Sequence, residues 1–151
     1  MQIYRMVAAA SLLVVLAFCL SENAEAGDCS ELPSDVKTTC FDATDLSTPQ
    51  AAFCRIWGES KWNNVLPHCL AVEIIRPNGA ARIVYAWGKA PQWGINKSGY
   101  ARAKAIIKEK TLKSKLPNGA YVEYRLSGDK LRGKFNREGY QNSIVLKRFG
   151  N

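Results

Sequence analysis

Only one histidine, His68, occurs in the 151 residues of this sequence. Nucleophilic catalysis by serine or cysteine needs a neighbouring base, and one histidine beside cysteines that we expect to be oxidised assembles no such pair. His68 lies on the inward phase of a predicted strand. A hydrogen-bonded structural role is favoured there over acid–base catalysis.

Known catalytic motifs are missing as well. The chain has no GxGxxG, P-loop or HExxH pattern, the motifs of dinucleotide, phosphate and zinc chemistry. It has no CxxC pair, which argues against a zinc site. A carboxylate pair needs both acids in one cleft, whereas Glu73 and Glu123 are predicted to face outward. We therefore predict a protein that is not an enzyme, with no catalytic residue, no metal site and no cofactor.

The first 26 residues have the pattern of a secretory signal peptide, with Arg5, an apolar run and a small-x-small triplet that ends at Ala26. Cys19 is a rival lipidation site, but Phe18 fits poorly before a lipid-modified cysteine. No later segment is apolar enough to span a bilayer. We predict a secreted or periplasmic protein, cleaved after Ala26, with no transmembrane segment in the mature chain.

Four cysteines remain after that cleavage: Cys29, Cys40, Cys54 and Cys69. An even number in an exported chain indicates two disulfides. Three pairings are open. We favour Cys54–Cys69, on the expectation that both lie on neighbouring strands, which leaves Cys29–Cys40.

Charge divides the mature chain into two parts. Residues 27–52 carry five acids and one base, a balance of −4, whereas residues 53–151 carry nineteen Lys or Arg and six Asp or Glu, a balance of +13. We predict an irregular, disulfide-held leader over 27–52, with one helical turn near 48–54 that Ser47 or Thr48 caps and Pro49 begins. The basic domain of 53–151 is expected to attract anions.

Apolar residues alternate with polar ones along most of the basic domain, as in strands with one buried and one wet face. In HCLAVEII we expect Leu70, Val72 and Ile74 to share the buried face. The alternating segments are HCLAVEII (68–75), AARIVYAWG (80–88), YARAKAIIK (100–108), TLKSKL (111–116), YVEYRL (121–126), LRGKF (131–135) and SIVLKR (143–148), with one more strand around 53–57.

Turn-forming residues separate these segments: PNG at 77–79 and 117–119, SGDK at 127–130 and REGY at 137–140. Eight strands joined by short turns have unpaired edges unless the sheet closes. We predict an all-β fold, an antiparallel up-and-down barrel of about eight strands. Segment 101–110 is rich in helix formers, and a helix there is the alternative to a strand.

The predicted interior mixes aromatic rings with alanines. Either the rings cross the lumen, which close packing favours, or an apolar cavity remains. Trp62 and Trp93 fall in the two longer loops, where exposed rings could line a barrel mouth and bind a small apolar or glycan ligand; Trp93 could equally cap the core. The candidate ligand-binding residues are Trp62, Trp93, Tyr85, Trp87 and His68.

Basic residues gather on the outward phase of the later strands. Because consecutive strands are neighbours, they form one wall, which is either a solvated face or a docking surface for an anionic polysaccharide, a lipid head group or an acidic protein. Nucleic acid is disfavoured, since the chain is exported and carries no motif for it. The wall comprises Arg102, Lys104, Lys113, Lys115, Arg125, Arg132, Lys134 and Lys147.

Short motifs resemble those of secreted bacterial calycin-like β-barrel modules of the lipocalin and avidin type. They are GxxxW at 58–62, LPH at 66–68, YAWG at 85–88, YRLSGDKLRGKF at 124–135 and, within it, the L-x-G-x-F hairpin at 131–135. The resemblance covers about 57–148 and leaves the leader unmatched. It implies a barrel that binds a ligand, and it carries over no catalytic residue. We expect a binding module, with docking through the basic wall as the alternative.

Overall fold

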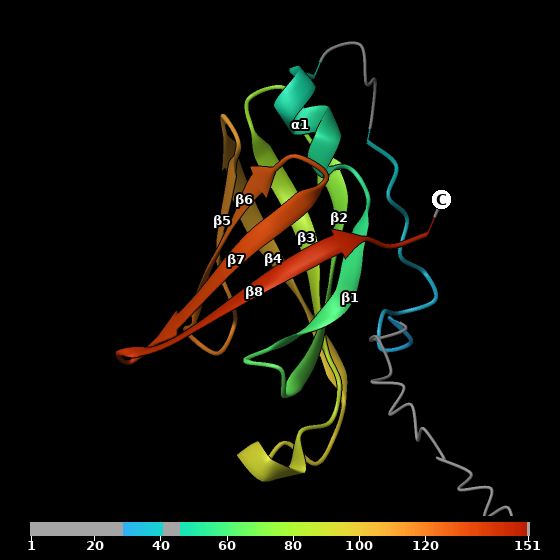
Figure 1. Cartoon of the computed structure of the whole chain (residues 1–151). Coiled ribbons are helices and arrows are strands. Elements are labelled where there is room, and N and C mark those ends of the chain that lie inside the picture. The colour runs from blue at the N-terminus through green and yellow to red at the C-terminus, as the bar shows by residue number, and fades with distance from the viewer. Residues whose placement is uncertain (1–28, 41–45, 151) are drawn as a thin grey trace, which may run out of the picture.

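The structure, a computed structural model, describes residues 29–40 and 46–150. The predicted signal peptide, its cleavage site and Cys19 lie outside the described residues. One short helix precedes eight strands, which run as a closed antiparallel barrel in chain order (Figure 1). The predicted fold class is confirmed. The elements are α1 (Thr48–Phe53), β1 (Ile56–Trp62), β2 (Leu66–Ile75), β3 (Ala80–Trp87), the 3-10 turn η1 (Pro91–Trp93), β4 (Gly99–Lys108), β5 (Thr111–Lys115), β6 (Tyr121–Ser127), β7 (Lys130–Arg137) and β8 (Tyr140–Arg148).

Segment 101–110 is a strand rather than a helix. β4 pairs with β3 from Trp87↔Gly99 to Ala80↔Ile106, and its second half pairs with β5. A strand with partners on both sides gains hydrogen bonds and packing that outweigh the intrinsic helix preference of its residues.

The helix near 48–54 begins as predicted. Ser47 is the N-cap of α1, and its side chain and that of Gln50 form a reciprocal capping box. Gln50 also donates its side-chain amide to the Pro77 carbonyl at 3.1 Å. This contact ties α1 to the β2–β3 turn, so that the helix covers one end of the barrel, here called the helix end (Figure 1).

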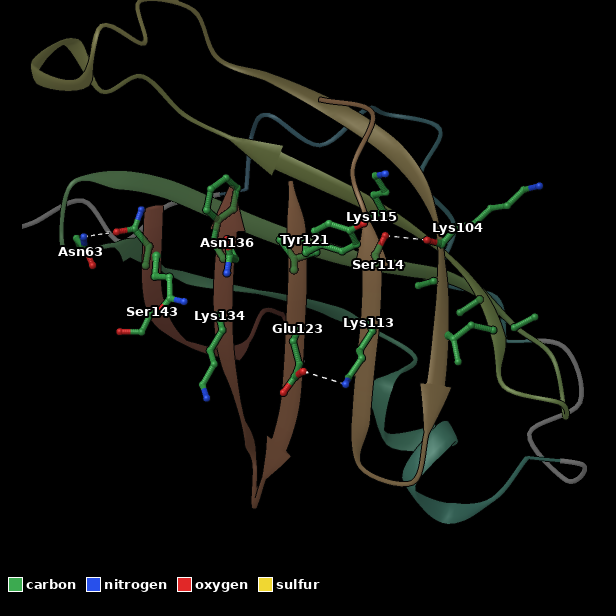
Figure 2. A pocket seen from close by; sticks show the side chains of 18 residues that line it. Asn63, Lys104, Lys113, Ser114, Lys115, Tyr121, Glu123, Lys134, Asn136 and Ser143 are labelled. Carbon is green, nitrogen blue, oxygen red and sulfur yellow. Dashed lines mark hydrogen bonds and ion pairs between the residues drawn. The ribbon is translucent and has the colours of Figure 1, made fainter. Parts of the chain in front are cut away.

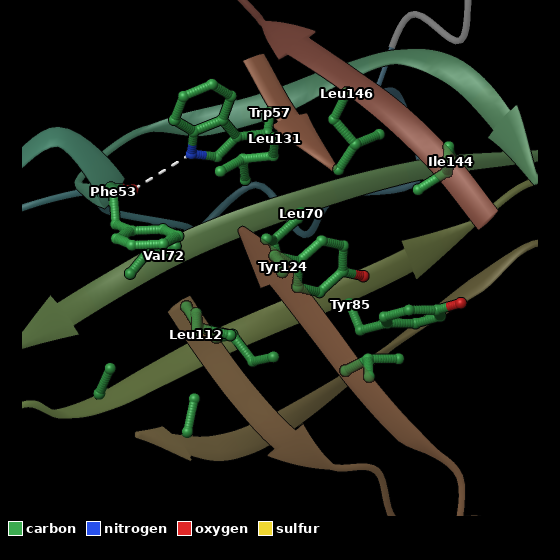
Figure 3. Packing of buried hydrophobic residues seen from close by; sticks show 14 of the residues in the cluster. Phe53, Trp57, Leu70, Val72, Tyr85, Leu112, Tyr124, Leu131, Ile144 and Leu146 are labelled. Carbon is green, nitrogen blue, oxygen red and sulfur yellow. Dashed lines mark hydrogen bonds between the residues drawn. The ribbon is translucent and has the colours of Figure 1, made fainter. Parts of the chain in front are cut away.

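Side chains fill the interior of the barrel (Figure 3). Trp57 is fully buried, and its indole N–H donates to the Phe53 carbonyl at 3.2 Å. A Cβ at Gly133 would lie 2.9 Å from the Tyr124 ring, so the missing side chain makes room for that ring. Around Trp57 and Tyr124 the rings therefore fill the interior, which is the alternative that close packing favoured.

Two β-bulges shift the inward phase. The β2–β3 register slips between Val72 and Ile74, and Ile75 rather than Ile74 is buried in the core. The β1–β2 register slips between Trp57 and Ser60, where Glu59 has φ +57°. Each bulge adds one residue to one strand, so residues beyond it change face relative to simple alternation. The expectation that Ile74 shares the buried face was therefore wrong.

The predicted disulfide pairing was also wrong. The bridges are Cys29–Cys69 and Cys40–Cys54. Cys54 does not lie on a strand beside Cys69, because it caps the C-terminus of α1. The leader instead crosses the outer face of the barrel, which brings Cys29 onto β2.

The leader covers the outer face of β1–β3. Cys29, Cys69 and Ala86 form a small buried cluster there, outside the barrel. Glu73 is only 3% exposed and accepts from Arg82 Nε at 2.8 Å. Arg102 donates to leader residue Asp35 at 2.8 Å, and this hydrogen bond lowers the pKa of the Asp35 carboxyl. Glu73 thus faces outward as predicted, but it is buried beside Arg82 and Arg102, which are themselves partly exposed.

Gly58 provides a test of this arrangement. A Cβ at Gly58 would lie 2.5 Å from Cys29 Sγ and 2.8 Å from Cys69 Sγ. We expect Gly58→Val to lower the free energy of unfolding by about 1–3 kcal/mol, because the added side chain overlaps the bridge. Chemical denaturation measures the change.

The same substitution should cost little in a Cys29→Ala/Cys69→Ala background, where both sulfur atoms are gone. It should cost its full amount in a Cys40→Ala/Cys54→Ala background. An equal loss in both backgrounds would contradict the Cys29–Cys69 pairing.

Candidate functional site

Four of the connections between strands lie at the end of the barrel opposite α1: β1–β2, β3–β4, β5–β6 and β7–β8. A cavity of about 500 Å³ opens there, here called the mouth cavity. This volume is within the usual range for small-ligand sites. Its apolar lining is Trp62, Leu66, Tyr85, Trp93, Ile95 and Phe135, and its polar lining is Arg137, Glu138, Tyr140 and Asn142.

Three of the five predicted ligand residues line this cavity: Trp62, Tyr85 and Trp93. The prediction that Trp62 is an exposed loop residue was wrong, because it ends β1 and is only 1% exposed. The bulge between Trp57 and Ser60 turns it inward. Trp93 belongs to η1 and is half-buried against the core.

Trp87 and His68 do not line the mouth cavity. Trp87 is half-buried, and its indole N–H donates to the Lys97 carbonyl at 3.2 Å. His68 lies behind Tyr85, with ring centroids 4.2 Å apart. Both residues therefore support the cavity wall from behind.

His68 is at the centre of a buried hydrogen-bond chain. Its Nδ1 is 2.7 Å from the Ala86 carbonyl, which can only accept, so Nδ1 carries the proton. In the neutral ring Nε2 then accepts from the Tyr124 hydroxyl at 2.7 Å. Burial lowers the pKa of His68 to about 4, although the hydrogen bond to Ala86 opposes the shift. A neutral, 1% exposed imidazole therefore orients Tyr124 and does not itself line the mouth cavity.

Two residues that line the cavity carry a buried polar group: the hydroxyl of Tyr85 and the indole N–H of Trp62. Burial raises the pKa of the Tyr85 hydroxyl well above its ordinary value, and the nearby Trp62 indole lowers it slightly. The indole N–H of Trp62 nevertheless falls outside hydrogen-bond geometry, and among the described residues it has no partner. An unpaired buried donor costs free energy, so this part of the wall is suited to an added acceptor.

The eight residues of the predicted basic wall are exposed on the outer face of β4–β8, which are consecutive neighbours in the barrel. Arg102 differs from the other members because Asp35 and Glu73 already neutralise it. Lys104, Lys113, Lys115 and Lys134 line a hollow on the outer face, and Arg132 lines a second hollow beside it. Arg125 and Lys147 are exposed outside both hollows.

Sequence reasoning missed several lining residues. Phe135 lies in the predicted strand 131–135 and Tyr140 in the predicted turn 137–140, and both line the mouth cavity. Tyr121 and Lys61 line the two outer hollows. The signal for Tyr121 and Tyr140 was available in the sequence, because a tyrosine on the wet phase of a strand or at a turn has no core to fill.

Comparison of the chain with protein-family models, with curated proteins and with solved structures gives no match. The calycin-like resemblance therefore stays an expectation from short motifs. Among the residues that the structure describes, no helix is long and apolar enough to cross a membrane. Within the same residues, no three His, Cys, Asp or Glu side chains gather as a metal site.

His68 makes stability depend on pH with a definite sign. Its pKa is 6.5 in the unfolded chain and about 4 in the fold, so between these values only the unfolded chain binds the proton. The contribution of His68 to the free energy of unfolding is fully present above pH 6.5. It is lost as the pH falls through 4, and the loss amounts to about 3 kcal/mol. Denaturant unfolding at several pH values measures the slope.

The imidazole itself can be observed, because the chain has no other histidine. Nitrogen-15 NMR should show the Nδ1–H tautomer at pH 6 and a titration midpoint well below 6.5. An imidazole that titrates near 6.5 would show that the buried chain of hydrogen bonds is not formed.

Proposed function

We propose that the protein is a non-enzymatic binding module that takes a small apolar or sugar-like ligand in the mouth cavity. The observation that carries this proposal is the cavity itself: about 500 Å³, walled by Trp62, Tyr85, Trp93 and Phe135. Aromatic rings at the rim of a concave site stack on flat apolar faces, including those of sugar rings.

The polar groups indicate which end of the ligand lies innermost. The Trp62 N–H lacks a partner among the described residues, and Tyr85 lies beside it. An ether, carbonyl or hydroxyl oxygen of a ligand would accept a hydrogen bond from the Trp62 N–H once the Tyr85 side chain moves aside. Arg137 and Glu138 stand at the rim, where a polar outer end of the ligand would remain near water. The expected ligand therefore has one apolar face and an oxygen at its inner end.

A rigid wall supports this function. The His68 ring contacts Tyr85 at a centroid distance of 4.2 Å with the planes tilted by 36°, and its plane lies within 17° of that of Tyr124. Both nitrogens of His68 are engaged in hydrogen bonds. Side chains held in this way lose little conformational entropy on binding, which favours affinity.

Ligand binding can be measured by titration of tryptophan fluorescence against a panel of fatty acids, isoprenoids, monosaccharides and short glycans. Native mass spectrometry of the purified protein detects a ligand that is retained during purification. We expect one class to bind, and Trp93→Ala to weaken that binding by about tenfold, since it removes a stacking face.

Tyr100→Ala is the matched control, because Tyr100 is an exposed aromatic on the outer face, away from the cavity. It should leave the affinity unchanged. The proposal fails if no class binds, or if Trp93→Ala and Tyr100→Ala have the same effect.

A further inference from the structure

A hollow of about 1150 Å³ lies on the outer face of β4–β8, apart from the mouth cavity. Its exposed side chains form two rows across the strands. The register Ile106↔Lys113↔Glu123↔Lys134↔Ser143 defines one row, and Lys115↔Tyr121↔Asn136↔Gln141 defines the other. Figure 2 shows Lys113, Glu123 and Lys134 side by side on neighbouring strands.

Positive charge dominates this hollow. Its lining includes Lys104, Lys113, Lys115 and Lys134 but one carboxylate, Glu123. Glu123 pairs with Lys113 at 3.3 Å, which leaves the other three lysines without a carboxylate in the lining. These side chains are exposed, so the groove presents cations to whatever enters it.

The charged tract continues past β8. A second hollow of about 470 Å³ shares Asn63, Lys134 and Ser143 with the first. It adds two more cations, Lys61 and Arg132. We call the two joined hollows the basic groove; it extends from β4 across β8 to the β1–β2 turn. Its length suits an extended ligand rather than a compact ion.

A tyrosine stands within the groove. Tyr121 is 58% exposed, and Lys115 Nζ lies 5.4 Å from its ring centroid. The exposed amides Asn136 and Gln141 follow in the same cross-strand row. A flat ring face, hydrogen-bonding amides and flexible ammonium groups together match a ligand that has ring faces, hydroxyls and repeated negative charges.

We propose that the basic groove binds an anionic polysaccharide, with a sugar ring stacked on Tyr121 and its acidic groups near Lys104, Lys115 and Lys134. Phe135 and Asn142 line both hollows, but the four residues proposed here to contact the polysaccharide do not line the mouth cavity, so either proposal can fail alone. The leader supports the assignment, because it neutralises Arg102 and covers β1–β3 but leaves this face open (Figure 1).

The geometry disfavours other polyanions. An acidic peptide that binds as an added strand needs a free sheet edge, and the barrel is closed. Single-stranded nucleic acid is held by successive aromatic platforms, whereas the groove lining holds Tyr121 as its exposed aromatic. A planar membrane surface would not reach into a concave groove.

The test uses polygalacturonate and dextran sulfate as probes, with neutral dextran as the uncharged control. Isothermal titration at low salt should show binding to a charged polysaccharide, and added salt should weaken it because salt screens exposed charges. Lys104→Ser/Lys115→Ser/Lys134→Ser should reduce the affinity by about tenfold or more.

Lys108→Ser/Lys130→Ser/Lys147→Ser is the matched control. It removes the same charge from exposed positions on β4, β7 and β8 that do not line the groove, and it should change the affinity by less than about twofold. Tyr121→Leu should weaken binding by about fivefold and Tyr121→Phe should retain it. All seven positions are exposed, and circular dichroism confirms that each variant is folded.

Three results would overturn the proposal. They are failure of both charged polysaccharides to bind, an equal loss in the two triple variants, and tighter binding of poly-glutamate, single-stranded DNA or anionic vesicles than of either polysaccharide. Trp93→Ala, which removes a wall of the mouth cavity, should leave polysaccharide binding intact. This separates the two proposed sites.

Discussion

Closure of the sheet between β1 and β8 is the constraint on which the rest of the structure depends. The seam consists of two residue pairs, Trp57↔Arg148 and Gly58↔Lys147. Trp57 strengthens it from inside, because its ring is fully buried and its N–H is bound to the Phe53 carbonyl. A closed sheet has no unpaired edge, and each strand acquires one inner and one outer side. Both candidate sites follow from that division.

The inner side is mainly apolar and packed up to the level of His68 and Tyr85, where the mouth cavity begins. The outer side is divided by the leader. Over β1–β3 the Cys29–Cys69 bridge and the Glu73–Arg82 pair turn an outer face into buried structure. Over β4–β8 the outer face stays open and cationic. One ring of strands thus carries an aromatic cavity at its end and a charged groove along its side.

Local patterns predicted most of the strands and the start of α1, because alternation and capping act over a few neighbouring residues. The two wrong side-chain predictions share one cause. Trp62 and Ile74 follow bulges, and a single inserted residue reverses every later side chain of that strand. The sequence carries no strong mark of either bulge. The disulfide pairing failed because Cys29 meets Cys69 only once the leader has crossed the barrel.

The sequence by itself determined the all-β class, the order of the strands, the basic character of β4–β8 and the lack of catalytic motifs, since each depends on composition or on periodicity along the chain. Tertiary structure alone decided which tryptophans line the mouth, which cations the leader neutralises and where the outer face is concave. Those properties depend on distances between strands that are far apart in sequence. Twist, bulges and closure set these distances, and no local pattern encodes them.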